Sequence, residues 1–324
     1  MSHLVLLFDG TWNDETDPNQ VTNIHRLKEL IIAATDVGSK KNDPRSGGGD
    51  DPEWSPPRIF YDTGVGTGGW WDRIVGGVLG KGLSANVRQG YRFLSQFYQP
   101  ERMVGWKKVA ATPILVFGFS RGAFTARSLA GFVAAAGLLK KEHCNARNLA
   151  FAWAYYRTPP KQRLPADKTR LEAISHDVKI DFLGVFDTVG SLGVPSGPAG
   201  NWAGRNDKFH DTKLGSAIKA ACHAVALDEH RNPFVPALFA RPDNLANRHV
   251  EQVWFPGVHS DVGGGYGAAS PGRTASADLS LGWMVTRSRQ YGAGLLIADP
   301  PVVSTAVDKP HDSLPGFVVS QMRP

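Results

Sequence analysis

The stretch that decides the fold is TPILVFGFSRGAFTARSLAGFVAAAGLL, residues 112–139. Residues 114–117 are continuously apolar, which is typical of a strand covered on both faces. Residues 118–122, GFSRG, fit the pattern G-x-S-x-G of a nucleophile elbow, a sharp turn from strand to helix with a serine at its top. The apolar residues after the turn predict a buried helix. The segment therefore predicts that Ser120 is a nucleophile at the end of a strand.

The two glycines of the elbow provide the physical basis for such a turn. Gly118 and Gly122 have no Cβ atom, so the chain can turn tightly and the helix can lie close to the strand. Ser120 would then hold a strained backbone conformation beside the positive end of the helix dipole. The pattern alone is loose and also arises by chance. Here a strand precedes it and a helix follows it, as an elbow requires.

The composition is that of an ordinary globular chain. Of the 324 residues, 42% are hydrophobic and 20% are charged, and we expect residues 1–324 to form a single domain. The formal net charge of +6 is spread along the chain, which disfavours nucleic acid and allows peripheral contact with an anionic membrane. Cys144 and Cys222 lack the spacing of a disulfide framework or a metal site. We expect no cofactor.

Three segments rich in Gly, Pro or polar residues are interpreted as loop or lid insertions, at about residues 39–57, 64–85 and 190–210. The second contains G-x-G-x-x-G, but no acidic residue follows at the spacing that binds a ribose, so a mobile loop near the site is favoured over a dinucleotide site. Trp70, Trp71 and Trp202 in these loops favour an acyl or aromatic substrate. Packing on the core is the alternative for the tryptophans.

Strand-like and helix-like patterns alternate along the chain. Strands are predicted at residues 4–8, 58–62, 114–117, 178–186 and 250–256, and further helices at residues 23–35, 74–97, 145–156, 213–227 and 278–291. This alternation predicts an α/β fold, a mostly parallel sheet with helices on both faces. In such sheets the site lies at the carboxyl ends of the strands.

That rule selects the residues that directly follow predicted strands: Asp9, Asp62, Ser120, Asp187 and His259. A serine needs a base to become a nucleophile, and a histidine base needs an acceptor on its second nitrogen. Ser120, Asp187 and His259 stand in the order Ser…Asp…His of α/β-hydrolases. We therefore predict a triad in which Ser120 attacks, His259 takes the proton and Asp187 orients His259.

Alternatives stay open for the base and for the acid. His223 and His230 flank a polar Asp-Glu turn and compete with His259 as the base. Asp261 is an alternative acid, although its closeness to His259 in sequence also suits an anchor for the glycine turn. Asp9 is a third candidate acid, or a residue that shapes or caps its own loop.

The oxyanion hole is expected to take one N–H group from Arg121, the residue after the nucleophile. The second N–H group normally comes from the loop after the strand two positions before the elbow strand. Counting back from residue 114 leads to the loop after residues 4–8, and so to Gly10 or Thr11. On this count the chain lacks the first two strands of a full hydrolase sheet.

Two other readings of the same residues remain. Asp9, Asp62, Asp187, His259 and Asp261 would also suit a divalent metal ion, although no local spacing such as H-E-x-x-H supports a metal site. Alternatively, the chain is an interaction module on a hydrolase fold whose site has decayed. Every position of the predicted triad is filled, which argues against the second reading.

Six blocks in order carry a resemblance to a known family: LFDGTWND, DTGVGTGG, GFSRGAFTAR, FLGVFDTVGSLG, HAVALDEHR and WFPGVHSDVGGGY. Together, from residue 6 to about residue 284, they resemble the α/β-hydrolase domain of type VI secretion phospholipase effectors and its uncharacterised bacterial and fungal relatives. The resemblance implies an esterase or lipase with the triad Ser120, Asp187 and His259. It also implies that residues 228–229 and Asp261 border the site.

We therefore expect a serine hydrolase of carboxyl esters that works through an acyl-enzyme, with an ester or a lipid, including phospholipid, as substrate. The secreted lipases of this family are longer and carry segments that cover or anchor the site, which leaves phospholipid and secretion open for this chain. The apolar run after Met1 is too short for a signal peptide. We expect a cytoplasmic product that a secretion route without a cleaved signal could still export.

Overall fold

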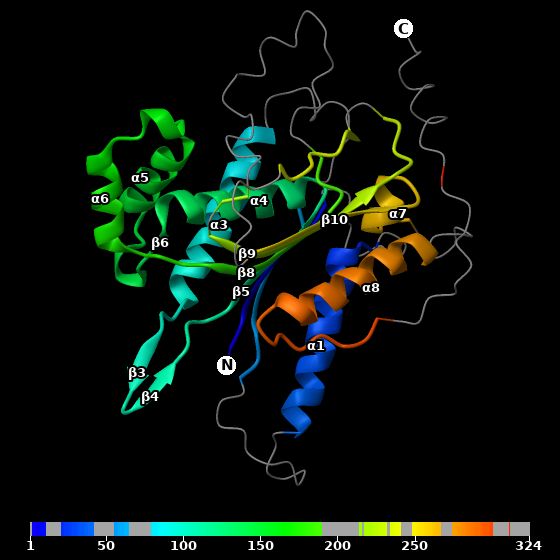
Figure 1. The fold of residues 1–324 in the computed structure, drawn as a ribbon, viewed down its shortest axis with the longest axis horizontal. Helices are drawn as coiled ribbons and strands as arrows, with labels where there is room; N and C mark the ends of the chain where they lie inside the picture. Colours follow the sequence, from blue (N-terminus) through cyan, green and yellow to red (C-terminus); the bar gives the residue numbers. More distant parts are fainter. Residues whose placement is uncertain are drawn as a thin grey trace, which may run out of the picture.

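The computed structural model of the protein describes residues 2–10, 21–41, 55–64, 79–189, 214–215, 217–231, 234–240, 248–266, 274–300 and 311. Its centre is a parallel sheet of six strands (Figure 1). They are β1 (Leu4–Phe8), β2 (Arg58–Asp62), β5 (Ile114–Phe119), β8 (Ile180–Phe186), β9 (Ile218–Ala226) and β10 (His249–Phe255). Their order in the sheet is β10-β9-β8-β5-β1-β2.

The strand order shows where a ligand should bind. β1 lies between β2 and β5, so the chain first builds outward to β2 and then returns to the other side of β1. The chain leaves β1 toward β2 and leaves β5 toward β8, in opposite directions, and a binding crevice is expected at the carboxyl ends of two such neighbouring strands. The predicted nucleophile Ser120 directly follows β5, and Asp9 directly follows β1. Both residues consequently lie at this switch point.

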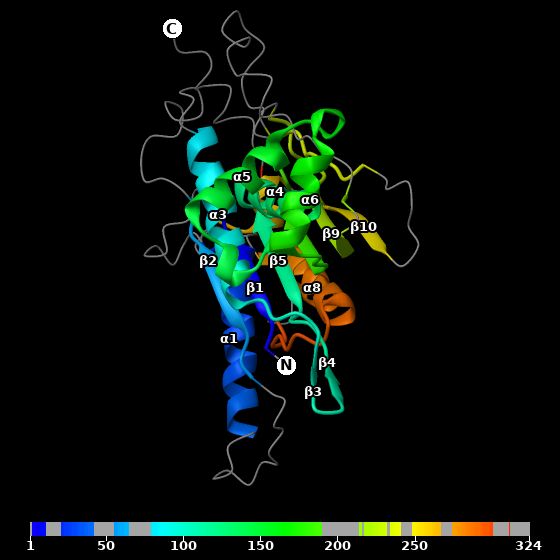
Figure 2. The same ribbon diagram turned by 90° about the vertical axis from the view of Figure 1, so that its left-hand side faces the viewer.

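Two layers of helices cover the sheet, as predicted (Figure 2). Alternate residues of β1 enter different cores: Leu4 and Leu6 pack on one face and Val5 and Leu7 on the other, because strand side chains alternate. The first face is covered by α3 (Leu79–Phe97), α4 (Arg121–Ala136) and α5 (Ala146–Arg157), and the second by α1 (Asn23–Lys41) and α8 (Thr274–Tyr291). No described helix is both long and apolar enough to cross a membrane.

The predicted helix at residues 213–227 is wrong, because its described part contains strand β9, which pairs with β8 and β10. The run IKAACHAVA is rich in alanine, the best helix former, and its composition therefore favoured the prediction of a helix. In the structure every residue of β9 except Lys219 is buried. Burial between two strands and two helix layers overrides local propensity here, and small side chains suit the crowded position.

Several elements were not predicted. β3 (Arg102–Val104) and β4 (Lys107–Val109) form an antiparallel hairpin that projects from the body of the molecule in Figures 1 and 2. β6 (Leu138–Leu139) pairs with β7 (Ser175–His176) beside α6 (Pro165–Ile174). The short helix α7 (His259–Gly263) follows β10.

The three predicted insertions fall mostly outside the described residues. The segment 190–210 does so entirely. Residues 39–41 instead continue α1, and residues 79–85 belong to α3, so the loop assignments were wrong for these parts. Trp70, Trp71 and Trp202 also lie outside the described residues. The predicted helix at residues 74–97 is confirmed from Leu79 onward.

Candidate active site

The segment around Ser120 has the backbone of a nucleophile elbow. Ser120 sits between β5 and α4 with φ 57° and ψ −120°, a conformation that is rare for a residue with a side chain. Its backbone N–H donates to Phe186 O at 3.1 Å, which ties the turn to the neighbouring strand β8. A Cβ atom on Gly118 would lie 2.4 Å from Gly122 O, and one on Gly122 would lie 2.1 Å from Phe8 O. Both positions therefore require glycine.

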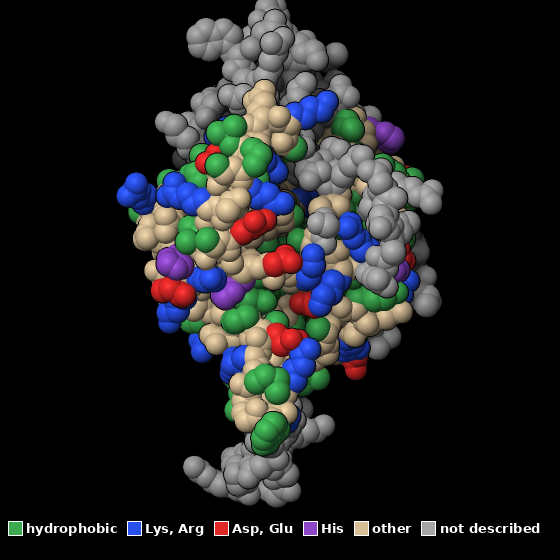
Figure 3. All heavy atoms as spheres, turned by 60° about the vertical axis from the view of Figure 1, so that its left-hand side comes forward, with side chains coloured by type: hydrophobic (Ala, Val, Ile, Leu, Met, Phe, Trp, Pro, Cys, Tyr) green, Lys and Arg blue, Asp and Glu red, His purple; other side chains and the backbone are tan. Residues whose placement is uncertain are grey.

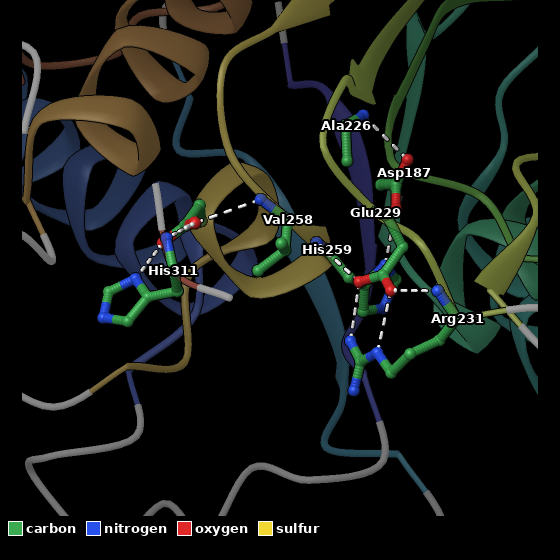
Figure 4. A network of polar contacts seen from close by, with 8 residues as sticks. Asp187, Ala226, Glu229, Arg231, Val258, His259 and His311 are labelled. Atoms are coloured by element: carbon green, nitrogen blue, oxygen red, sulfur yellow. Dashed lines mark hydrogen bonds and ion pairs between the residues drawn. The ribbon is translucent and has the colours of Figure 1, made fainter. Parts of the chain in front are cut away.

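An Asp–His pair lies at the same edge of the sheet. His259 Nδ1 is 2.6 Å from Asp187 Oδ2, and both side chains are buried (Figure 4). Asp187 directly follows β8 and has φ 33°, so its backbone is strained. Its second carboxylate oxygen accepts from the N–H group of Ala226 at 2.9 Å. With both oxygens engaged, the carboxylate holds one orientation toward the imidazole ring.

The imidazole of His259 lies between two aromatic rings. The centroid of Phe119 is 4.7 Å from that of His259, and the centroid of Phe234 is 4.9 Å from it. Phe119 directly precedes Ser120, so this packing brings the ring beside the elbow. No hydrogen bond joins the Ser120 hydroxyl to His259, both of which the structure describes, and the ring that packs on His259 belongs to the residue before Ser120.

A partly buried ion pair supports the backbone of His259. Glu229 Oε2 accepts from the N–H group of His259 at 3.2 Å, and Glu229 also binds the Arg231 guanidinium through both oxygens (Figure 4). Burial opposes ionisation of Glu229, but hydrogen bonds from Arg231 and the His259 amide lower the pKa of Glu229 below its ordinary value. Arg231 also lies over the ring of Phe234, 3.9 Å from its centroid. Sequence reasoning placed residue 229 at the border of the site but did not predict this contact.

The other acidic candidates bind the backbone of the same loop. Asp228 Oδ2 accepts from Gly257 N–H at 2.6 Å. Asp261 Oδ2 accepts from Val258 N–H at 3.0 Å, and Asp261 Oδ1 lies 2.6 Å from His311 Nδ1. Figure 4 shows Asp187 and His311 on opposite sides of Val258 and His259. The carboxylate that contacts the His259 ring is thus that of Asp187, while Asp228 and Asp261 shape the loop that carries His259.

Asp9 is held within its own loop. Its carboxylate accepts hydrogen bonds from Thr22 Oγ1 at 2.8 Å, from the Tyr61 hydroxyl at 2.7 Å and from the Gly10 N–H at 2.7 Å. A Cβ atom on Gly10 would lie 3.7 Å from the Cβ atom of Ser120, so the loop after β1 does border the elbow. The Gly10 amide is engaged by Asp9, and Thr11 lies outside the described residues.

The alternative base, His223, is a fully buried core residue. Its Nε2 accepts from the N–H group of Thr188 at 3.1 Å, and its Nδ1 lies 3.3 Å from Gln252 Oε1. Burial, helped by the charge of Arg127, lowers the pKa of His223 to about 4. Thr188 directly follows Asp187, so His223 helps to hold the strained turn of the acid. This role was not predicted, because residue 223 was assigned to a helix. The other rival, His230, is exposed.

The metal hypothesis finds no support in the described geometry. Within the described ranges, the group of His, Cys, Asp and Glu side chains close enough to share an ion is Cys222, His249 and Glu251. It contains none of the residues proposed for a metal from the sequence. Both oxygens of Glu251 are bound by Arg287, at 2.8 and 3.0 Å, so this cluster forms a satisfied ion-pair network.

The parallel sheet, the serine elbow and the Asp–His pair at one edge define the α/β-hydrolase class. Comparison with known proteins narrows this class. The sequence model of the Tle1-like phospholipase effector catalytic domain of type VI secretion systems matches residues 2–287. The chain belongs to this family.

Individual relatives are distant and longer. An uncharacterised protein of Saccharomyces cerevisiae, YEL023C, is 26% identical over 270 residues, which are 74% of this chain and 34% of the yeast protein. Among solved structures, an uncharacterised protein from Pseudomonas aeruginosa is 19% identical, with a TM-score of 0.48 over 91% of this chain and 46% of that chain. The Tle1 effector bound to the VgrG spike of the type VI secretion system is 21% identical, with a TM-score of 0.41 over 83% and 52%.

Proposed function

We propose that the chain is a serine hydrolase of carboxyl esters, with Ser120, His259 and Asp187 as its triad. The observation that carries the proposal is the Asp187–His259 pair, 2.6 Å apart, beside a serine with the backbone of a nucleophile elbow. Ser120, Asp187 and His259 follow β5, β8 and β10, which end at one edge of the parallel sheet although they are far apart in the sequence. This position supports the proposed roles of Ser120 as nucleophile, His259 as base and Asp187 as the acceptor that orients the base.

In this mechanism the Ser120 hydroxyl attacks the ester carbonyl and passes its proton to Nε2 of His259. Asp187 keeps the proton on Nδ1, leaves Nε2 as the acceptor, and stabilises the imidazolium that forms. The hydrogen bond between Ser120 and Nε2 closes as the substrate enters, since such bonds are often long in unliganded sites. His259 then gives the proton to the leaving alcohol, and a water molecule repeats the sequence on the acyl-enzyme.

The negative charge of the tetrahedral intermediate needs hydrogen-bond donors. Arg121 is the first residue of α4, so its N–H group has no acceptor within the helix and is available to the oxyanion. The positive end of the α4 dipole acts in the same direction. Thr11 is the proposed second donor, because the Gly10 amide already binds Asp9.

Lipid acyl esters, phospholipids among them, are the proposed substrate class. The support is the family, whose description is that of phospholipase effectors. The chain spans about a third of the yeast relative and about half of each solved relative. Secretion through a type VI system is likewise a proposal, supported by the same family description.

The test is a panel of p-nitrophenyl esters of increasing chain length, together with labelling by a fluorophosphonate. The protein should hydrolyse at least one ester and should be labelled on Ser120. Ser120→Ala should abolish labelling and lower kcat by about ten-thousand-fold or more while the circular dichroism spectrum is unchanged. Full turnover by Ser120→Ala would overturn the mechanism, and a folded protein that neither hydrolyses any ester nor labels would overturn the proposed function.

A further inference from the structure

Four large apolar side chains are exposed near the carboxyl ends of β9 and β10. Leu227, Val235, Leu238 and Trp254 expose 59%, 65%, 42% and 49% of their surface. Single exposed apolar residues are common on proteins, but a contiguous patch marks an interaction surface. These four residues are referred to below as the rim patch.

Leu227 and Trp254 are neighbours on one face of the sheet. Trp254 on β10 lies opposite Val225 on β9, and the N–H group of Leu227 donates to Phe255 O at 3.0 Å. Alternate residues along a strand share a face, so Leu227 lies on the face of Val225 and diagonally across from Trp254. Diagonal neighbours are within reach of a side chain as long as tryptophan.

The loop that carries the other two residues is fixed to the same face. Gln252, two residues before Trp254 on β10, accepts from Phe239 N–H at 2.7 Å and donates to Phe239 O at 3.2 Å. The Arg127 guanidinium donates to Leu238 O at 3.3 Å. Leu238 is therefore held beside the row that ends in Trp254, and Val235 lies three residues earlier in the loop.

Two residues of the rim patch are next in sequence to residues that hold His259 or its loop. Phe234, next to Val235, packs its ring against His259. Asp228, next to Leu227, accepts a hydrogen bond from Gly257, two residues before His259. A surface that contacts the rim patch would therefore lie close to His259 and its loop.

We infer that the rim patch is the surface through which this protein sits on a lipid bilayer while an acyl ester enters the site. The inference rests on the proposed function, because a lipid ester must be taken from its bilayer at the carboxyl ends of the strands. The apolar side chains would leave water on contact with the bilayer. The net charge of +6 would add attraction to anionic headgroups.

A second apolar surface provides a matched control. The hairpin of β3 and β4 exposes Met103, Val104 and Trp106, the last completely (101%). In Figure 3 hydrophobic and basic side chains project at the lower end of the molecule, where this hairpin lies in Figures 1 and 2. The hairpin precedes β5, so it lies at the opposite end of the sheet from Ser120, and a bilayer bound there could not deliver substrate to the site.

Binding should be measured by co-sedimentation with phosphatidylcholine vesicles containing phosphatidylglycerol, using Ser120→Ala protein so that no lipid is consumed. Adding L227S, V235S, L238S and W254S together should weaken binding by at least about tenfold, the loss expected from even one apolar anchor. The hairpin variant M103S, V104S and W106S should bind like its parent. With Ser120 present, the rim variant should hydrolyse a soluble butyrate ester normally and vesicle lipid at least about tenfold more slowly.

Circular dichroism and thermal melting should match the parent, and V235S and W254S alone serve as milder variants if the combined one misfolds. Vesicle binding unchanged by the rim substitutions, or lost with the hairpin substitutions, would overturn the inference. Absence of ester hydrolysis in the parent would count against the proposed function only, because vesicle binding is measured without turnover. Normal hydrolysis of soluble esters with unchanged vesicle binding would count against the rim patch only.

Discussion

The carboxylate of Asp187 lies 2.6 Å from Nδ1 of His259, although 72 residues separate the two in the chain. Asp187 follows β8 and His259 follows β10, and β9 runs between these strands. The backbone of β9 completes the arrangement, since the N–H group of Ala226 binds the second oxygen of Asp187. The acid is thus oriented by the sheet itself, and the histidine ring is oriented by the acid.

Replacing each candidate acid by asparagine should show which aspartate, Asp187 or Asp261, supports catalysis. Asp187→Asn should lower kcat for a soluble ester by about a thousand- to ten-thousand-fold, because an amide favours the wrong tautomer of His259. Asp261→Asn should lower kcat far less, since Asp261 binds Val258 and His311 instead of the His259 ring. Both variants should be compared by initial rates and circular dichroism. A larger loss with Asp261→Asn would reverse the assignment.

The elbow should reject a methyl group at residue 122. In Gly122→Ala the new Cβ atom would lie 2.1 Å from Phe8 O, and backbone must move to relieve this contact. We expect the free energy of unfolding to fall by about 3 kcal/mol, or the protein to become insoluble. Urea titration measures this. The control is Gly282→Ala in α8, where a Cβ atom meets nothing within 4 Å, and stability should rise by about 0.5–1 kcal/mol. Equal stability of the two variants would contradict the steric argument.

His223 should make stability depend on pH. Its pKa is about 4 in the folded protein and about 6.5 when unfolded, so the unfolded chain binds more protons between these values. The contribution of His223 to the free energy of unfolding should therefore be complete above about pH 6.5. The free energy of unfolding should fall by up to about 3 kcal/mol as the pH drops to 4. Urea titrations at pH 7.5, 6 and 5 measure this. His223→Gln should flatten the dependence, while His230→Gln, at an exposed position, should leave it unchanged. If the free energy of unfolding of His223→Gln depended on pH as steeply as that of the parent, other groups would be responsible for the pH dependence.

The Glu229–Arg231 pair should act as a unit. Removing either partner leaves a partly buried charge without its counterion, so Glu229→Ala and Arg231→Ala should each cost about 1–3 kcal/mol of stability. The double variant should cost clearly less than the sum of the two, with a coupling of about 1–3 kcal/mol. Turnover should also fall in Glu229→Ala, because His259 N–H loses its acceptor. The exposed pair Lys168–Glu172 is the control and should show no coupling. Additive losses at residues 229 and 231 would contradict the prediction.

The parts of the fold that sequence predicts well are those with a strong local pattern. The strand before Ser120 and the helix after it are encoded within 28 residues, since an apolar run and two glycines suffice to specify the turn. Asp187 and His259 were also predicted, because Asp187 directly follows β8, His259 comes shortly after β10, and parallel strands end at one edge. The structure brings both side chains into contact; their catalytic roles remain a proposal.

β9 shows where this reasoning fails. Its sequence favours a helix locally, and only pairing between β8 and β10 makes it a strand. The consequences for the site are direct, because His223 and Ala226 on β9 hold Thr188 and Asp187. Because β9 was predicted as a helix, these two contacts were not predicted either.

Sequence by itself determined the elbow at Ser120, the alternation of strands and helices, and the family, because each depends on residues close together in the chain or on their order. Only the tertiary structure decided which aspartate meets His259, that Glu229 supports the backbone of His259, and that Tyr61 binds Asp9. These are contacts between segments brought together by the strand order. Asp187 contacts the imidazole ring, whereas Asp261 binds the loop beside it, a difference of a few ångströms. The spacing of residues in the sequence cannot predict so small a difference in space.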